Sequence, residues 1–137
     1  MSLFVLDASY ALTWCFPDRS TANTDAALQR MESHSDTARV PWVWQVEVAN
    51  ALGKAVSRAK IPLPRALEIW DELLLLPIRQ VGIRSIPELM TLAVKHNLSV
   101  YDTCYLQLAL ISNLPIATND EKLKRAAEAS GLVAIVP

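Results

Sequence analysis

Short apolar runs alternate along this chain with longer segments in which apolar residues recur every three or four positions. Short runs that contain Val, Ile or Phe and are bounded by turn residues predict buried β-strands. Segments with the longer period predict amphipathic helices. The runs place strands at residues 3–6, 38–41, 78–83, 114–118 and 132–136.

Helices are expected between these strands, and turn-forming residues set several of their ends. Pro17 and Pro77 each stop a helical pattern, and Gly131 follows the last one. Strands that alternate with helices are typical of a parallel sheet covered on both faces. We therefore expect an α/β fold. The helices are expected at residues 8–16, 21–33, 43–58, 67–76, 87–96, 102–111 and 121–129.

Composition narrows the picture further. A chain of 137 residues fits one domain, and a hydrophobic content of 52% is enough for a dense core. The formal net charge of −1 gives no overall attraction to nucleic acid or to an anionic membrane, so any contact with nucleic acid must come from a local basic patch. The two cysteines have no metal-binding spacing and form no disulfide framework.

The chain carries no evident targeting or membrane segment. The first apolar run is short and has no basic stretch before it, unlike a signal peptide. The leucines at residues 73–76 are flanked by acids and a proline, far short of the roughly 20 apolar residues that span a membrane. We expect a soluble, cytoplasmic protein.

Two carboxylates follow predicted strands. Asp7 comes directly after the first strand, with Ser9 two residues on, and Asp120 follows the fourth. In an open parallel sheet the carboxyl ends of the strands form the crevice where ligands bind. Helix capping explains each residue equally well when it is taken alone, because Asp7 precedes a predicted helix and Thr118 lies three residues before a glutamate, the spacing of a capping box.

Two further acids lie on predicted helices. Asp102 opens its helix, so capping again explains a carboxylate there, although the apolar pair at 100–101 would draw it inwards. Glu47 lies at the border of an apolar stripe, and no residue three or four positions away can pair with it, so a solvated glutamate is the alternative. The stripe comprises Trp44, Val48, Ala51, Leu52, Ala55 and Ala59.

Considered together, Asp7, Glu47, Asp102 and Asp120 predict a metal site. Clustered carboxylates raise one another's pKa values unless a cation compensates. Ligands that are all oxygen select hard cations, Mg²⁺ or Mn²⁺, rather than zinc or copper. Such metals activate water and stabilise charge on a phosphoryl group.

The segments around these acids resemble the four signature blocks of PIN-domain ribonucleases, and the small single-domain form is similar to the VapC toxins of bacterial and archaeal toxin–antitoxin pairs. The resemblance spans residues 3–136. Departures are minor: Cys104 stands where many relatives carry a small residue, and Asn119 precedes the last acid. The blocks lie at residues 7–9, 46–52, 101–109 and 117–123.

This resemblance implies a single PIN-like domain over residues 1–137, a three-layer α/β/α sandwich with a five-stranded parallel sheet. It implies an acidic metal site made by the four acids, with Ser9 and Thr118 as supporting polar groups. The implied activity is cleavage of RNA within the strand, dependent on Mg²⁺ or Mn²⁺. The implied partners are a second copy of the chain and a cognate antitoxin.

For the mechanism, we expect Asp7 and Asp102 to be the main ligands of the metal, and Asp120 and Glu47 to bind it directly or through water. A water activated by the metal attacks the scissile phosphate in line. Lys54 and Arg58 are candidates for contacts with the RNA backbone, because phosphate contacts dominate affinity. An ordinary solvated helix face explains these two residues equally well.

Other classes of protein compete with this interpretation. A non-catalytic metal-dependent ligand-binding module would carry Asp-x-Ser-x-Ser after its first strand, but position 11 is Ala. A phosphoacceptor receiver domain would have adjacent acids after the first strand, and Asp7 is single. A PIN-domain nuclease that is not paired with an antitoxin remains a third alternative.

Overall fold

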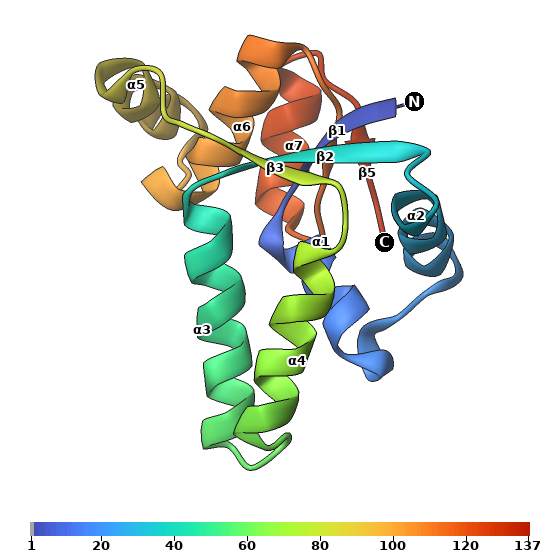
Figure 1. Cartoon of the computed structure of the whole chain (residues 1–137). Coiled ribbons are helices and arrows are strands. Elements are labelled where there is room, and N and C mark those ends of the chain that lie inside the picture. Colours follow the sequence, from blue (N-terminus) through green and yellow to red (C-terminus); the bar gives the residue numbers. More distant parts are fainter. Residues whose placement is uncertain (1) are drawn as a thin grey trace.

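A computed structural model of the chain describes residues 2–137 and confirms the expected fold class (Figure 1). All five strands pair in parallel within one sheet, in the order β3-β2-β1-β4-β5. β1 therefore lies in the middle of the sheet. The strands are β1 (Ser2–Leu6), β2 (Asp36–Pro41), β3 (Ile78–Val81), β4 (Ile116–Ala117) and β5 (Ala134–Ile135).

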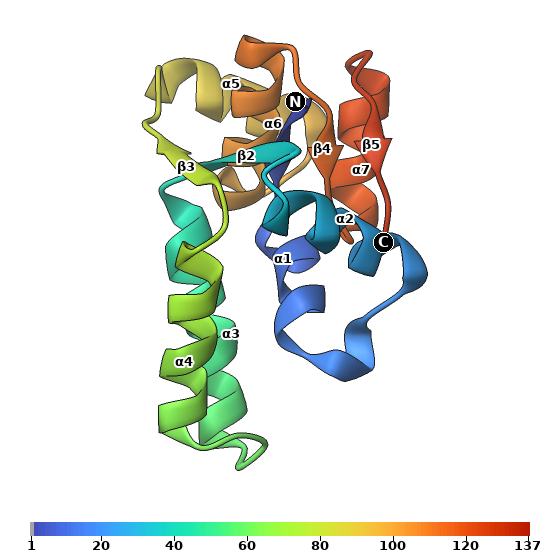
Figure 2. The ribbon, with the colours of Figure 1, turned by 45° about the vertical axis from the view of Figure 1, so that its right-hand side comes forward.

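The helices form a layer on each face of this sheet. Right-handed crossovers place α1–α4 on one face and α5–α7 on the other, because the chain reverses its direction across the sheet after β3. Packing agrees with this, since α3 contacts α1 and α4 whereas α6 contacts α5 and α7 (Figure 2). The helices are α1 (Ala8–Cys15), α2 (Ala22–Glu32), α3 (Val43–Ser57), α4 (Leu63–Leu74), α5 (Ile86–His96), α6 (Val100–Ser112) and α7 (Glu121–Ala129), with a 3₁₀ turn at Pro17–Arg19.

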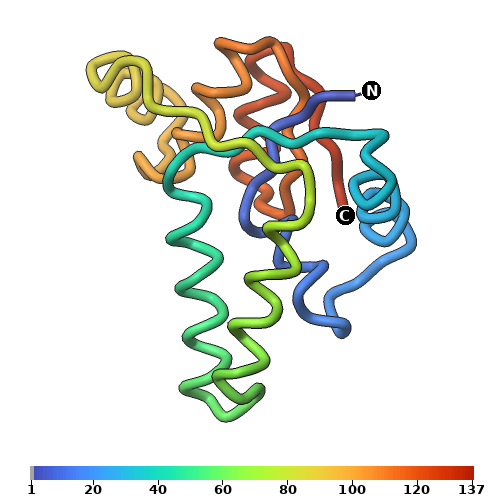
Figure 3. The backbone as a smooth tube through the Cα atoms, in the orientation of Figure 1, coloured from blue at the N-terminus to red at the C-terminus, as the bar shows by residue number. Residues whose placement is uncertain are grey.

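The helix pair α3 and α4 extends away from the sheet as an antiparallel hairpin (Figure 3).

Within residues 2–137, no helix combines the length and the apolar character needed to cross a membrane.

Two helices begin earlier than the apolar pattern indicates. α6 begins at Val100 because the hydroxyl of Ser99 caps it, accepting the N–H of Asp102 at 3.1 Å. α4 begins at Leu63 and takes Pro64 into its first turn, where the missing N–H of proline has no helical partner to lose. A proline near a helix start is therefore part of the helix here and not a boundary.

The structure also shortens several expected elements. β4 and β5 each retain only two residues in ladder geometry, although longer apolar runs surround them. α3 ends at Ser57, and Ala59 has a left-handed backbone with φ of 55°. Ala59 therefore does not belong to the buried stripe of that helix.

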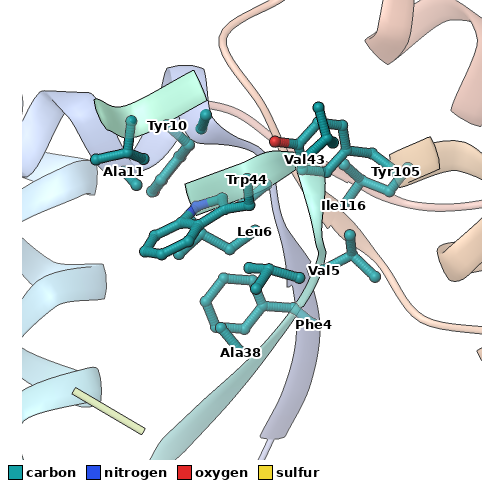
Figure 4. Packing of buried hydrophobic residues seen from close by; sticks show 14 of the residues in the cluster. Phe4, Val5, Leu6, Tyr10, Ala11, Ala38, Val43, Trp44, Tyr105 and Ile116 are labelled. Carbon is teal, nitrogen blue, oxygen red and sulfur yellow. The ribbon is translucent and has the colours of Figure 1, made fainter. Parts of the chain in front are cut away.

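The core lies where β1 meets the helices of both faces. Val5 and Leu6 are fully buried, and Figure 4 shows them in the same cluster as Trp44 from α3 and Tyr105 from α6. Because β1 is buried on both of its faces, the position of Asp7 at its end is firmly set.

Candidate functional site

The carboxyl ends of β1 and β4 lie side by side. Leu6 is in register with Ala117, and the N–H of Asp7 donates to the carbonyl of Ala117 at 2.9 Å. The residues that follow these strands, Asp7 and Thr118, therefore lie next to each other at the carboxyl ends of the strands. Ligands bind at these carboxyl ends in open parallel sheets.

The carboxylate of Asp7 is buried and is held by two hydroxyls. Asp7 is 4% exposed, and its Oδ2 atom accepts hydrogen bonds from Ser9 at 2.5 Å and from Thr118 at 2.7 Å. Asp7 occupies the N-cap position of α1, but its side chain makes no capping hydrogen bond. Helix capping therefore does not explain this acid.

The loop after β4 is tied to the same carboxylate. Thr118 is 1% exposed, and its hydroxyl accepts the N–H of Asp120 at 2.9 Å while it donates to Asp7. The hydroxyl of Ser9 accepts the N–H of Asn119 at 2.9 Å. The two hydroxyls thus fix the backbone that carries Asp120 relative to Asp7.

Asp120 is itself a helix cap. Its Oδ1 atom accepts the N–H groups of Lys122 at 2.8 Å and Leu123 at 3.2 Å, at the beginning of α7. The capping explanation is therefore correct for Asp120, although the residue that caps is the aspartate and not Thr118. One carboxylate oxygen is engaged in this way, and the cap fixes the direction of the other.

Glu47 reaches the site from α3, on the opposite layer from α6. Its side chain is half-buried, and its Oε1 atom accepts a hydrogen bond from the hydroxyl of Tyr105 at 2.7 Å. Tyr105 is fully buried on α6. The glutamate is thus held by a residue distant in sequence and is not an ordinary solvated side chain.

Asp102 lies at the third position of α6, where Ser99 and not Asp102 provides the cap. Its side chain is half-buried. A carboxylate in the first turn of a helix is stabilised by the positive end of the helix dipole.

The four carboxylates interact electrostatically. Burial raises the pKa of Asp7, the hydroxyls of Ser9 and Thr118 oppose that rise, and the charges of Asp102 and Asp120 add to it. Burial likewise raises the pKa of Glu47, the hydrogen bond from Tyr105 lowers it, and the other three acids raise it further.

Asp102 shows the same effect with one difference. Burial and the charge of Asp120 raise its pKa, whereas the hydroxyl of Ser99 and the ammonium of Lys122 lower it. The structure therefore brings the four predicted acids close enough for mutual repulsion. Lys122 is a basic residue whose charge opposes this repulsion at Asp102.

The acids do not form a ready-made metal cage. Within residues 2–137, no three carboxylate, imidazole or thiol side chains are grouped so that they could hold a metal ion as they stand. The donor chemistry nonetheless suits a hard cation, because each of the four acids offers carboxylate oxygens only. The hydrogen bonds described above use only one carboxylate oxygen of each of three acids. These oxygens are Oδ2 of Asp7, Oε1 of Glu47 and Oδ1 of Asp120.

Lys54 and Arg58 lie away from the acids. Both are exposed near the C-terminal end of α3, about 10 and 16 Å along the helix axis from Glu47 at a rise of 1.5 Å per residue. They line a hollow of about 140 Å³ that Arg19 and Lys60 also line. The structure thus gives these two residues a basic surface and no contact with the acids.

Tyr105 is a site residue that the apolar pattern hides. It lies in a helix that is apolar almost all round, and its partner Glu47 is 58 positions away in the chain. Its phenol is nevertheless a signal, because a buried tyrosine hydroxyl needs a hydrogen-bond partner.

Comparison with known sequences identifies similar proteins. The sequence model of the PIN domain family matches residues 4–129. The chain is 27% identical to ribonuclease VapC9 of Mycobacterium tuberculosis over 138 residues, which cover 98% of this chain and 99% of that protein. A VapC ribonuclease of Mycobacterium bovis, Mb0985, is similar to the same extent, with 27% identity and coverage of 98% and 99%.

Comparison with solved structures shows that the fold is shared. The crystal structure of PAE2754 from Pyrobaculum aerophilum matches with a TM-score of 0.77 and 19% identity, covering 98% of this chain and 84% of that one. A chain in the crystal structure of VapBC2 from Rickettsia felis, bound to a DNA fragment from its promoter, matches with a TM-score of 0.69 and 14% identity, covering 98% of each chain.

Proposed function

Since the chain belongs to the PIN-domain family, we propose that it is an endoribonuclease that depends on Mg²⁺ or Mn²⁺ and is the toxin of a toxin–antitoxin pair. One observation carries the proposal: Asp7 and Asp120, which follow β1 and β4, and Glu47 and Asp102, on α3 and α6, lie near enough for their charges to raise one another's pKa values at the carboxyl ends of the strands. The names of the similar mycobacterial proteins support RNA as the substrate. The domain extends over residues 1–137.

A hard divalent cation fits the donor set of this site. Asp7, Glu47, Asp102 and Asp120 are the proposed ligands and catalytic residues, and a cation among them would offset their repulsion. When bound, it supplies an activated water and compensates negative charge on the scissile phosphate.

The chain's own residues position and tune these ligands. Ser9 and Thr118 hold one oxygen of Asp7 and lower its pKa, which favours the ionised form that a metal requires. Tyr105 does the same for Glu47. The cap of α7 fixes Asp120 through two backbone N–H groups. Asp7, Glu47 and Asp120 are therefore each oriented by donors of their own.

Contacts with the RNA backbone are assigned to Lys54 and Arg58. They lie with Arg19 and Lys60 on a surface where only one acid, Asp18, lines the same hollow. A local excess of positive charge of this kind attracts phosphates even though the chain as a whole carries a formal charge of −1.

The proposed partners are a cognate antitoxin and a second copy of the chain. The antitoxin is supported by the likeness of this chain to one in the structure of VapBC2 from Rickettsia felis. The homodimer follows from the family resemblance alone, and the proposed location is the cytoplasm. An alternative is that the chain is a PIN-domain nuclease without an antitoxin, or a module that binds a metal and a ligand without catalysis.

Cleavage of RNA by the purified chain tests this proposal. We expect a pool of structured RNAs to be cut within the strand in the presence of Mn²⁺ or Mg²⁺, and cutting to stop on chelation. Asp7→Asn should abolish cleavage, whereas Asp71→Asn, which removes the same charge from an exposed position on α4, should not. Equal cleavage by Asp7→Asn and the wild type would rule out the role of Asp7.

Co-purification tests the toxin assignment separately. We expect the chain to form a stable complex with the product of a short adjacent gene, and that complex to cut RNA more slowly than the free chain. An active nuclease that no neighbouring gene product inhibits would favour the alternative without an antitoxin.

A further inference from the structure

A basic hollow lies between the C-terminal end of α5 and one face of α7. Its volume is about 380 Å³, and it is lined by Lys95, His96, Asn97, Lys122 and Arg125, with two alanines of α7 completing the wall. No carboxylate is among the lining residues. The hollow thus gathers basic side chains from two helices that the sheet topology places on the same layer.

One face of α7 carries both basic and small side chains. Lys122 and Arg125 are three residues apart, and Ala126 and Ala129 continue the same helix face at the following turn. The long basic side chains are exposed while the alanines are short, which leaves room above the helix surface. A small anion can therefore approach the helix closely.

The basic side chains of the hollow are not neutralised by the protein. The salt bridges found within residues 2–137 involve Arg30 and Arg65, so Lys95, Lys122 and Arg125 are in none of them. The Nε2 atom of His96 is buried and has no hydrogen-bond partner in the described part of the chain. The Nε atom of Arg125 donates to the carbonyl of Glu121 at 3.4 Å, so the donors that face an anion here are the outer guanidinium nitrogens of Arg125 and the ammonium groups of Lys95 and Lys122.

Lys122 connects this hollow to the acidic site. It lies two residues after Asp120, and its backbone N–H donates to the Oδ1 atom of that carboxylate at 2.8 Å. The hollow therefore begins next to the four acids. A polyanion that enters the acidic site meets strong repulsion, and adjacent positive charge is what can offset it.

We propose that this basic hollow, defined by Lys95, His96, Asn97, Lys122 and Arg125, binds adjacent backbone phosphates of the RNA strand beside the acidic site. The inference rests on the proposed nuclease function. Arg125 can form a two-pronged contact with phosphate oxygens, Lys95 and Lys122 act as point charges, and Asn97 offers amide donors. An acidic segment of a protein would satisfy the same charges. A nucleic acid strand is favoured because the proposed cleavage requires that strand to lie beside the neighbouring carboxylates as well.

Binding of an oligonucleotide tests the proposal without relying on cleavage. The probe is a fluorescent single-stranded 12-mer of uridine, titrated with the full chain in EDTA at several salt concentrations. The test variant is Lys95→Gln/Arg125→Gln. The control is Arg79→Gln/Arg84→Gln, which removes two exposed positive charges at and just after β3, the strand at one edge of the sheet. A 12-residue polyglutamate peptide serves as the acidic protein segment.

We expect the test variant to bind the oligonucleotide roughly 25-fold more weakly at about 0.1 M salt, because each phosphate contact with a single strand contributes a salt exponent of about 0.7. The slope of the logarithm of the binding constant against the logarithm of the salt concentration should become shallower by about 1.4 in this variant. The control should bind like the wild type, and polyglutamate should bind none of the three proteins measurably. All three proteins should unfold at similar temperatures.

Two results would overturn the proposal: equal affinity of the test variant and the control, or an equal loss of binding for oligonucleotide and polyglutamate. The second result would indicate a docking surface for an acidic protein segment. Failure of the nuclease proposal gives a different pattern. In that case the wild type cuts no RNA with Mn²⁺ or Mg²⁺, while the affinity difference for uridine 12-mer is still observed.

Discussion

Replacing Thr118 by valine tests the hydroxyl that organises the acidic site. The side chain is 1% exposed, and its hydroxyl donates to Asp7 at 2.7 Å and accepts the N–H of Asp120 at 2.9 Å. Valine has nearly the same shape, so packing changes little. Both hydrogen bonds are lost.

The magnitude follows from these contacts. A hydrogen bond to a charged group stabilises the folded state by about 1.5–3 kcal/mol, and a partly buried N–H left without a partner costs about 1 kcal/mol. The extra apolar methyl returns about 0.8 kcal/mol. We therefore expect Thr118→Val to lower the free energy of unfolding by about 2–3 kcal/mol, which is roughly 6–12 °C in Tm for a domain of 137 residues.

Thr13→Val is the matched control. Thr13 is 2% exposed, and its hydroxyl donates to the carbonyl of Tyr10 at 2.6 Å, outside the acidic site. Losing this neutral hydrogen bond costs about 1 kcal/mol. Only Thr118→Val should also raise the pKa of Asp7, because the Thr118 hydroxyl lowers that pKa.

Urea unfolding measures the stability, and carbon NMR of the side-chain carboxyl measures the titration of Asp7. The reasoning is refuted if Thr118→Val unfolds within about 0.5 kcal/mol of the wild type and leaves the titration of Asp7 unchanged.

Two further substitutions test the electrostatics of the site. Burial raises the pKa of Asp7 in the folded state, so folding stability linked to this group is present at low pH and is lost as the pH rises through the folded pKa. Without metal at about pH 7, Asp7→Asn should therefore melt at a higher temperature than the wild type, with the difference vanishing at about pH 3; a lower Tm at pH 7 would contradict the repulsion. Tyr105→Phe should raise the pKa of Glu47 and lower stability by about 1 kcal/mol, because the lost hydroxyl lowers that pKa. NMR titration and urea unfolding check this against Tyr101→Phe, which alters an exposed ring, and identical titration of Glu47 in both variants would argue against the contact.

Much of the fold follows from the local pattern of the sequence. The helix expected at residues 121–129 has those bounds in the structure, and the strand before Asp7 ends where its apolar run ends. Periodicity succeeds here because these elements bury a face that their own residues define. The resemblance implies five parallel strands but gives no order for them, and the local pattern cannot supply one because neighbours such as β1 and β4 are distant in sequence.

Element ends and site contacts are harder to predict. Ser99 sets the start of α6 through one hydrogen bond, which apolar spacing does not reveal. The strand pattern predicts that Asp7 and Asp120 share the carboxyl end of the sheet, and the resemblance adds Thr118 as a supporting group. Neither predicts the direct hydrogen bond between Asp7 and Thr118, which joins positions 111 residues apart. The hydrogen bond from Tyr105 to Glu47 is of the same kind. Such contacts depend on the packed sheet and helices and not on any local pattern.

The basic hollow shows the same limit. In the sequence alone, Lys122 and Arg125 lie on a predicted helix whose charges are typical of a solvated face, and His96 ends the predicted helix at residues 87–96. Only the packing of α5 near α7 brings them together with Lys95. Charge on two separate helices becomes a binding surface through the fold.

Binding of Mn²⁺ tests the central claim, that the four acids form a hard-cation site, most directly. The measurement is Tm of the metal-free chain as Mn²⁺ is added, for the wild type, Asp7→Asn, Asp102→Asn and the control Asp71→Asn. At about 100 times its Kd, a bound ion stabilises the folded state by about 2.7 kcal/mol, so we expect a saturable rise of roughly 8–11 °C for the wild type and the control. Asp7→Asn and Asp102→Asn should lose this rise. An equal rise in all four proteins, or none in the wild type, would contradict the account.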